Sequence, residues 1–303
     1  MDRFTGLQIF VRVVETGSFS KAASDLGMTQ PTVTKHITAI ERQLGVRLLN
    51  RNSRGINLTE IGALYFERCR VVLRELEAAE NIVGQSQGEI TGTLRIGTSM
   101  TFGRQVIAPL LIGFLEQNPG LKVDLSCDDH YVDVVGQGLD MAIRLGKLAD
   151  SALGCRYLGT NPWVMIASGA YLSKHGLPDR PEELAAHQCL VYSTVQGDDV
   201  WHVRAPLGKD VPVHVSGRLK SNNLSILLTA VRAGFGIAIV PNYAAAAAIR
   251  AGEVTRIMTE HVLPQQEINA VFPSPRFVPS KVSAFASYLL QRFEGPWWQH
   301  ALP

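Results

Sequence analysis

The sequence predicts a mixed fold, with a small α+β unit at the N-terminus, one long connecting helix and a larger α/β part in two lobes. Three observations predict this class. Two short helical patterns meet at a glycine between Ser18 and Leu44, an unbroken helical pattern covers residues 59–88, and apolar strands alternate with helices from Leu94 onward. We therefore divide the chain into residues 1–58, 59–88 and 89–303.

The stretch from Ser18 to Leu44 has the pattern of a helix-turn-helix. We expect the first helix over about residues 20–26, with the hydroxyl of Ser20 capping it. Gly27 then supplies the left-handed turn, and Thr29 caps a second helix that has a proline in its first turn.

The second helix is predicted to have two different faces. Its buried stripe has spacings of four, three and four residues: Val33, Ile37, Ile40 and Leu44. Its outer face is polar and free of acids: Gln30, Thr32, Thr34, Lys35 and Thr38. Such a face suits the major groove of DNA, although an ordinary helical hairpin with a solvated face has the same pattern.

A β-hairpin wing is predicted next. Four apolar residues flank the turn-forming stretch 52–55: Val46, Leu48, Ile56 and Leu58. Arg51 and Arg54 then lie near the tip, either against DNA or in a merely solvated turn.

The net charge of +2 is unevenly distributed. Residues 1–57 contain eight Lys or Arg and four acids, residues 58–88 contain three and five, and residues 89–303 contain eighteen of each. The positive charge therefore accompanies the helix-turn-helix, which favours a polyanionic partner for that part alone.

A long helix begins at Thr59 and reaches about residue 87 without a proline. Apolar residues recur along it in alternating steps of four and three: Tyr65, Cys69, Val72, Leu76, Ala79 and Val83. We expect this seam to form a dimer coiled coil, because paired recognition helices address two half-sites. The alternative is a helix packed on its own domain.

From Leu94 the pattern predicts a mainly parallel sheet. Strands are expected over residues 94–97, 121–126 and 140–144, and helices over about 102–117 and 131–138. Ligands bind such sheets at the carboxyl ends of strands, which directs attention to residues 98–101. A second set follows, with strands at 163–167, 190–192, 211–215 and 234–240, and helices at 224–233, from 241 and at 282–293.

The composition argues against several classes of protein. With 46% hydrophobic and 18% charged residues, the chain is expected to be globular and cytoplasmic, because it has neither a signal-peptide pattern nor an apolar run long enough to cross a membrane. The four cysteines, Cys69, Cys127, Cys155 and Cys189, are widely spaced, so we expect buried thiols and no metal site or cofactor, and a peroxide-sensing pair stays open.

The chain resembles the LysR-type transcriptional regulators. The resemblance begins with F-x-x-V-x-x-x-G-S-F-S-x-A-A-x-x-L over residues 10–26, runs through T-Q-P-T-V-T-K-H-I-x-x-I-E-x-x-L-G-V-x-L-L-x-R over 29–51, and closes with L-T-x-x-G over 58–62. The phrases G-x-L-R-I-G, N-P-G-L-x-V, G-x-D-x-A-I-R and A-G-x-G-I-A-x-x-P continue it downstream.

This resemblance implies an effector domain of periplasmic-binding-protein type, with one subdomain over about 89–161 and 267–303 and the other over about 162–266. It also implies a homodimer or tetramer that binds an inverted-repeat operator in double-stranded DNA. A small molecule, carboxylate-bearing or aromatic, controls it, and RNA polymerase is the expected further partner.

The resemblance also implies which residues contact DNA. Together with the outer helix face, the expected contacts are Gln30, Pro31, Thr32, Thr34, Lys35, Arg51 and Arg54. The chain departs from the common family pattern at Thr34-Lys35-His36, where Ser-Arg-Gln is usual, and at Leu49-Asn50, where Phe-Glu is usual. Because lysine lacks the two-pronged donor of arginine, the base read by Lys35 is open.

By position in the family, the expected effector contacts are Ser99, Met100, Thr101, His130, Arg144, Trp201, Asn222, Asn223 and Phe235. Ser99, Thr101 and Asn222 are the expected donors to a carboxylate, although each also suits a helix cap. Arg144 either neutralises an anionic ligand or pairs with Asp140.

Two rival functions remain. An enzyme needs a nucleophile or metal constellation, and the eight histidines have no catalytic motif beside them. A ligand-independent architectural DNA-binding protein needs the basic domain but not the large neutral second part, so ligand-dependent DNA binding separates it from a regulator.

Overall fold

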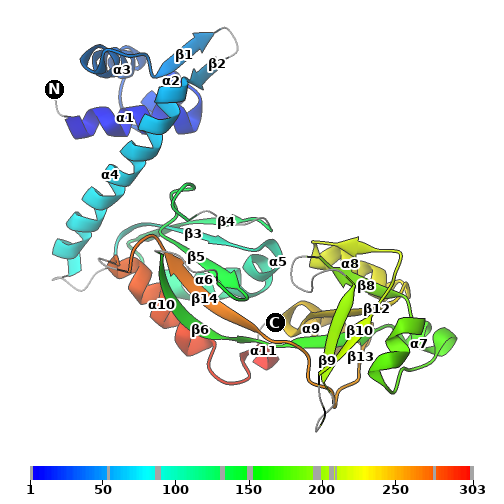
Figure 1. The fold of residues 1–303 in the computed structure, drawn as a ribbon. Coiled ribbons are helices and arrows are strands. Elements are labelled where there is room, and N and C mark those ends of the chain that lie inside the picture. The colour runs from blue at the N-terminus through cyan, green and yellow to red at the C-terminus, as the bar shows by residue number, and fades with distance from the viewer. Residues whose placement is uncertain are drawn as a thin grey trace. The chain divides into compact units, whose positions relative to one another are not determined.

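The computed structural model describes residues 3–52, 55–85, 90–129, 134–148, 153–193, 199–204, 208, 210–275 and 278–300. The chain divides into two compact units, residues 1–88 and 89–303, each of which is described by itself. Figure 1 labels their elements.

The first unit is a winged helix-turn-helix followed by a long helix. Its elements are α1 (Arg3–Thr16), α2 (Phe19–Asp25), α3 (Gln30–Leu44), β1 (Leu49–Asn52), β2 (Gly55–Leu58) and α4 (Glu60–Gln85). The two strands pair antiparallel with Leu49 opposite Leu58. The three short helices enclose a core that includes the fully buried Ile9, Phe10 and Ile37, and the predicted fold of this part is confirmed.

Helix ends follow the predicted chemistry with one exception. The Thr29 hydroxyl accepts the backbone N–H of Thr32 at 3.4 Å at the start of α3, and Gly27 has a φ of 64° in the turn before it. The prediction that Ser20 caps α2 is wrong. The cap is Ser18, because α2 begins at Phe19, whose ring packs against the core from the first helical position.

Helix α4 packs on its own domain at its start. The Tyr65 ring lies 5.4 Å from the ring of Phe10 on α1, and Cys69 is 2% exposed in the same core. Cys69 therefore lacks the exposure that a dimer seam needs, whereas Tyr65 is half-buried and its place in the seam stays a prediction. Leu76 is half-buried, and the side chains of Ala79 and Val83 lie outside the described residues.

The second unit contains two five-stranded sheets. The first has the order β4-β3-β5-β14-β6 and the second β11-β8-β12-β7-β13, and a β9–β10 hairpin packs beside the second. Their strands are β3 (Gly92–Thr98), β4 (Leu121–Cys127), β5 (Met141–Leu145), β6 (Gly154–Asn161), β7 (Trp163–Ala167), β8 (Cys189–Tyr192), β9 (Val200–Arg204), β10 (Asp210–His214), β11 (Lys220–Ser221), β12 (Ile237–Pro241), β13 (Thr255–Ile257) and β14 (Gln266–Phe272).

The three strands on which the parallel prediction rested do pair in parallel, as β4-β3-β5. Each whole sheet nevertheless combines two parallel and two antiparallel pairs, so a mainly parallel sheet is wrong for the sheet as a whole. The chain leaves the first sheet through β6 and enters the second through β7 after one residue, and β14 later returns between β5 and β6. Strands that carry the chain between two sheets run against their neighbours, and periodicity within one segment does not reveal this direction.

Helices cover the sheets. They are α5 (Met100–Phe102), the π-helical turn η1 (Gly103–Ile107), α6 (Ala108–Gln117), α7 (Gly169–His175), the 3₁₀ turn η2 (Pro181–Ala186), α8 (Leu224–Arg232), α9 (Asn242–Arg250), α10 (Ser280–Arg292) and α11 (Trp297–His300). The helix expected over 131–138 is wrong in its described part, because residues 134–138 form turns.

An aromatic cluster joins the two layers of this unit. Tyr243 on α9 packs edge-on against Phe102 on α5 at 5.1 Å, and Trp297 on α11 lies 6.2 Å from Phe102. All three rings belong to one continuous core that contains side chains from both sheets. The two sheets are therefore held together by shared apolar burial as well as by connecting strands.

Candidate nucleic-acid interface and ligand cleft

The first turns of α3 present the predicted polar face to solvent. Gln30, Pro31, Thr32 and Lys35 are exposed, and Thr34 is half-buried. Val33 and Ile37, on the opposite side of the helix, are fully buried. The stripe is shorter than expected, because Leu44 at the last position of α3 is 42% exposed.

Glu41 connects this helix to the wing, and the sequence reasoning missed it. Its Oε1 accepts the backbone N–H of Leu48 at 2.8 Å and that of Leu49 at 3.1 Å. Charge-assisted hydrogen bonds of this kind are stronger than neutral ones, so they fix the start of β1 relative to α3. The sequence signal that could have identified Glu41 is that it is an acidic residue within a basic segment.

A hollow of about 690 Å³ lies between the second half of α3 and the start of the wing. It is lined by Thr38, Glu41, Arg42, Gly45, Val46, Arg47 and Leu49. The exposed Arg42 and Arg47 add two positive charges that the motif comparison did not single out. Of the predicted wing contacts, Arg54 and the side chain of Arg51 lie outside the described residues.

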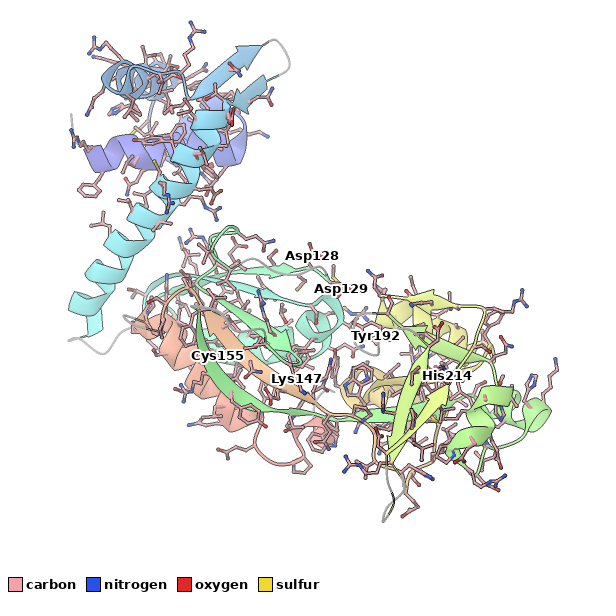
Figure 2. The ribbon with its side chains drawn as sticks, in the orientation of Figure 1. Asp128, Asp129, Lys147, Cys155, Tyr192 and His214 are labelled. Atoms are coloured by element: carbon pink, nitrogen blue, oxygen red, sulfur yellow. The ribbon has the colours of Figure 1, made fainter. Side chains whose placement is uncertain are left out.

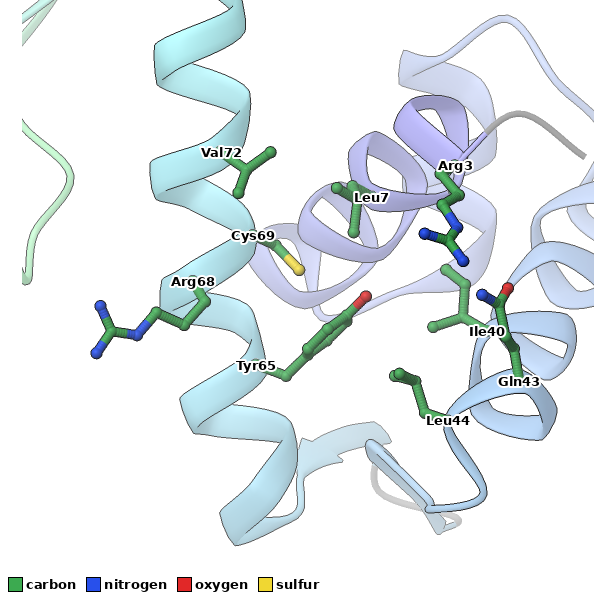
Figure 3. A pocket seen from close by; sticks show the side chains of 10 residues that line it. Arg3, Leu7, Ile40, Gln43, Leu44, Tyr65, Arg68, Cys69 and Val72 are labelled. Carbon is green, nitrogen blue, oxygen red and sulfur yellow. The ribbon is translucent and has the colours of Figure 1, made fainter.

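A second groove, of about 380 Å³, lies between α1, the end of α3 and α4. Figure 3 shows the Tyr65 ring reaching from α4 toward Ile40 and Leu44, with Leu7 and Val72 nearby. Burial raises the pKa of Tyr65 to about 12 and that of Cys69 to about 11. Both groups therefore stay uncharged at neutral pH, and the lining is mainly apolar, with Arg3 and Arg68 as its charged residues.

In the second unit, the carboxyl ends of β3 and β4 meet beside the start of α5. Ser99 occupies the N-cap position of α5 but makes no capping hydrogen bond with its side chain. Instead, Asp129 Oδ1 accepts the backbone N–H of Met100 at 2.9 Å. A carboxylate of the chain itself therefore occupies the position at which an anionic ligand would be expected.

The second sheet contributes the carboxyl end of β8. Figure 2 labels Tyr192 there, together with Asp128 and Asp129, which follow β4. The pKa of the buried Tyr243 is raised first by desolvation and then by the charges of Tyr192 and Asp129, which puts these three groups within electrostatic reach.

The other predicted cleft residues divide into two groups. Asn222, after β11, is exposed, whereas the Asn223 side chain caps α8 by accepting the N–H groups of Ser225 and Ile226. Thr101 is 4% exposed and Met100 is 47% exposed. His130 lies outside the described residues.

Two predicted ligand contacts are misplaced. Trp201 is 1% exposed and packs in the core beneath the second sheet with Val213 and Met165. Phe235 precedes β12 and therefore lies at the amino end of the parallel β8–β12 pair, opposite the carboxyl ends that form the cleft. It packs beside the guanidinium of Arg218 at 5.7 Å.

The suggested pairing of Arg144 with Asp140 is also wrong. Asp140 pairs with the buried Lys281 of α10 at 3.2 Å and accepts the backbone N–H of Arg95 at 2.8 Å. Arg144 lies half-buried on β5, opposite Asn269 of β14.

The cysteines are four free thiols with raised pKa values. Burial raises the pKa of Cys189 to about 12, and burial followed by the charge of Asp129 raises that of Cys127. Within the described part of the chain, no His, Cys, Asp or Glu side chains gather in threes to hold a metal ion. In the same part, no helix is long and apolar enough to cross a bilayer.

Sequence families match both units. The bacterial regulatory helix-turn-helix family of lysR type matches residues 4–63, and the LysR substrate binding domain matches residues 87–294. The chain belongs to the LysR-type transcriptional regulators.

Relatives and solved structures of this family cover nearly the whole chain. The transcriptional activator AaeR of Escherichia coli is 34% identical over 97% of this chain and 94% of its own length. The regulator CrgA of Neisseria meningitidis is 34% identical over 94% of this chain and 95% of its own length. The CrgA structure aligns with a TM-score of 0.61 at 32% identity, covering 96% of this chain and 99% of that one.

The virulence activator AphB of Vibrio cholerae aligns in full length with a TM-score of 0.59 at 26% identity, over 96% of this chain and 99% of that one. The LysR-type chain is accordingly a DNA-binding transcriptional regulator with an effector-binding domain, as the resemblance implied.

Proposed function

We propose that this LysR-type regulator binds an inverted-repeat operator as a dimer or tetramer, and that its binding to DNA changes when a small molecule binds to the second unit. The observation that carries the proposal is the exposed, acid-free face over the first turns of α3, directly opposite its buried stripe. The cytoplasm is the expected compartment, and RNA polymerase is the expected further partner.

Base recognition is assigned to Gln30, Thr34 and Lys35. Gln30 and Lys35 are exposed on adjacent turns at the start of α3, where recognition helices contact base edges. A glutamine amide suits adenine and a lysine ammonium suits guanine. Thr32 and Pro31, at the entrance of the same helix, are assigned to close backbone and sugar approach.

Phosphate contacts are assigned to the arginines of the hollow and the wing. Arg42 and Arg47 line the hollow between α3 and β1, and both are exposed. Arg51 and Arg54 are added from the family resemblance. Contacts of this kind add affinity for any sequence and make binding strongly dependent on salt.

Two substitutions separate these roles. Lys35→Ala should relax preference at one operator position, at a cost of about 1–3 kcal/mol, whereas Arg54→Ala or Arg42→Ala should weaken binding to all sequences and reduce the salt slope by about one. Footprinting and salt titration measure both effects. Lys122→Ala, an exposed lysine on β4, is the charge-matched control and should change neither.

The reverse outcome, in which Lys35→Ala weakens all sequences equally and Arg42→Ala alters sequence preference, would contradict the assignment of helix and hollow.

A dimer contact is assigned to the outer side of α4 and the apolar groove beside it. Leu64 is 68% exposed and Val72 is 43% exposed, and Leu44 lines the groove at the end of α3. Apolar side chains so exposed on one helix are typical of an interface with a second copy. The proposal keeps Tyr65, Val72 and Leu76 of the predicted seam, adds Leu64, and leaves out Cys69, which is 2% exposed.

Leu64→Asp should therefore shift the assembly toward monomer in sedimentation experiments at micromolar concentration. Leu177→Asp is the control, because Leu177 is 57% exposed and belongs to the second unit. An unchanged assembly for Leu64→Asp would assign the dimer contact elsewhere.

The effector is assigned to the cleft at the carboxyl ends of β3, β4, β8 and β11. Because Asp129 already fills the first N–H position of α5, we expect the effector to direct a hydrogen-bond donor toward Asp129. Ser99 then has its hydroxyl available, and an acceptor end such as a carboxylate is expected toward Asn222. Thr101 contributes little at this position, because it is almost fully buried.

Three compounds that share a benzene ring test this polarity. Benzylamine and phenol should raise the melting temperature of the full chain more than benzoate does, and Asp129→Asn should remove the preference for benzylamine. Asp124→Asn, a change at an exposed position on β4, the strand that precedes Asp129, is the control. A larger shift with benzoate than with benzylamine would contradict the donor assignment and leave the DNA-binding proposal unaffected.

A further inference from the structure

A third hollow, of about 190 Å³, lies between helices that belong to the two sheets of the second unit. One wall comes from α5 and η1, and the other from α8 and α9. It is lined by Thr101, Arg104, Gln105, Leu224, Ser225, Leu228, Thr229, Arg232, Ala244 and Ala247. We call it the inter-sheet groove. Apart from Thr101, its lining contains none of the residues predicted to contact the effector.

The polar lining of the inter-sheet groove is rich in hydrogen-bond donors. Each wall contributes one guanidinium group, Arg104 from η1 and Arg232 from α8, and no carboxylate is among the ten lining residues. Thr101 and Ser225 add hydroxyl groups, whereas the Thr229 hydroxyl already donates to the Ser225 carbonyl at 2.9 Å. This combination suits an acceptor that carries negative charge.

The charges of the two arginines are balanced unequally. Arg232 Nε pairs with Glu253 at 2.6 Å, so its charge is largely compensated. Arg104 is exposed and has no ion-pair partner within the part of the chain that the structure describes. The groove therefore keeps one uncompensated positive charge, and a bound anion would balance it.

Gln105 is a further polar side chain of the lining. Its Oε1 is shielded from solvent and has no hydrogen-bond partner among the described residues. Because a rotation of the amide by 180° exchanges its oxygen and its NH₂ group, Gln105 can present a donor to a ligand.

The local backbone supports a binding role as well. Arg104 and Gln105 lie within the π-helical turn η1. A Cβ on Gly103, at the start of this turn, would lie 2.5 Å from Cys127 Sγ and 2.8 Å from Thr98 Cγ2, so the helix packs against β3 and β4 where only glycine fits. Isolated π-helical turns are uncommon and are frequent at functional sites.

We propose that the inter-sheet groove binds a small oxyanion, the carboxylate or phosphate group of a metabolite, between Arg104 and Arg232. Such a ligand connects the helices of the first sheet with those of the second, so its binding favours one arrangement of the two. The site is additional to the effector cleft, and its test does not depend on the identity of the effector.

The test measures thermal stability of the full chain in inorganic phosphate and in succinate, each against sodium chloride at matched ionic strength. Both oxyanions should raise the melting temperature in a saturable manner, and Arg104→Gln should weaken the half-saturation concentration about tenfold. Arg104→Lys keeps the charge but not the two-pronged geometry, so its half-saturation concentration should lie between those of the unchanged chain and Arg104→Gln. A response to one oxyanion only identifies which group the groove prefers.

Two control variants locate the effect. Lys122→Gln removes an exposed positive charge from β4, and Lys174→Gln removes one from the last turn of α7. Neither residue lines the inter-sheet groove, so neither variant should change the oxyanion response. If either control variant weakens the response as much as Arg104→Gln does, the anion binds elsewhere and the proposal is wrong. A melting temperature that is the same in chloride, phosphate and succinate also overturns it.

Discussion

Gly62 is the position at which a single added methyl group should most clearly disturb the DNA-binding unit. It lies in the first turn of α4, where the helix crosses the backbone that leads into β1. A Cβ at this position would lie 2.0 Å from the carbonyl oxygen of Leu48 and 3.0 Å from Thr59 Oγ1. The Leu48 carbonyl also accepts the backbone N–H of Thr59 at 2.9 Å, which limits how far it can move.

The magnitude follows from three opposing contributions. Overpacking against backbone costs about 1–3 kcal/mol, and a weakened hydrogen bond at Leu48 costs about 1 kcal/mol. Alanine gains about 1 kcal/mol over glycine as a helix former. Gly62→Ala should therefore lower the free energy of unfolding of the first unit by about 2 kcal/mol, which corresponds to about 8–16 °C in a domain of this size.

The assay uses the distribution of tryptophan. All four tryptophans belong to residues 89–303, so their fluorescence reports only on the second unit, whereas far-UV circular dichroism reports on both. The Gly62→Ala transition should move to lower temperature in dichroism alone. Gly6→Ala is the control, because its Cβ would meet only the flexible end of Ile40 at 3.2 Å. Equal melting of Gly62→Ala and Gly6→Ala would refute the steric reasoning.

Three further predictions concern buried groups. Lys281→Met should destabilise the second unit by about 3–5 kcal/mol in urea unfolding, because it leaves Asp140 charged and unpaired, and adding Asp140→Asn should recover more than half of the loss; a double variant no more stable than Lys281→Met would show that the stranded charge is not the cause. Glu41→Ala should cost about 1.5–3 kcal/mol and weaken DNA binding, whereas Glu41→Gln, which keeps an acceptor, should cost less; equal losses would argue against the wing anchor. Iodoacetamide at pH 8 should modify the exposed Cys155 first, because a pKa of about 11 leaves roughly one Cys69 thiol in a thousand ionised. The rate at Cys69 should rise about tenfold per pH unit up to that pKa, and rapid labelling of native Cys69 at pH 8 would contradict its burial.

Local chemistry was sufficient for the DNA-binding unit. The cap at Thr29, the glycine turn at Gly27 and the spacing of Val33 and Ile37 act within a few residues of one another, so the sequence alone located both helices and the polar face of α3. Strand positions in the second unit were also predictable, because each apolar run is local.

The directions of the strands and the packing partners of each element could be determined only from the tertiary structure. Trp201 and Phe235 were expected at the effector site from their positions in the family, but the sheet buries the first and places the second at its amino end. Cys69 has the spacing of a coiled-coil seam, but it is buried in one core with residues of α1, which lies more than fifty residues away in sequence. Spacing along a helix or strand identifies which residues share a face. Which other element packs against that face is determined by long-range contacts, so it cannot be predicted from the sequence of one segment.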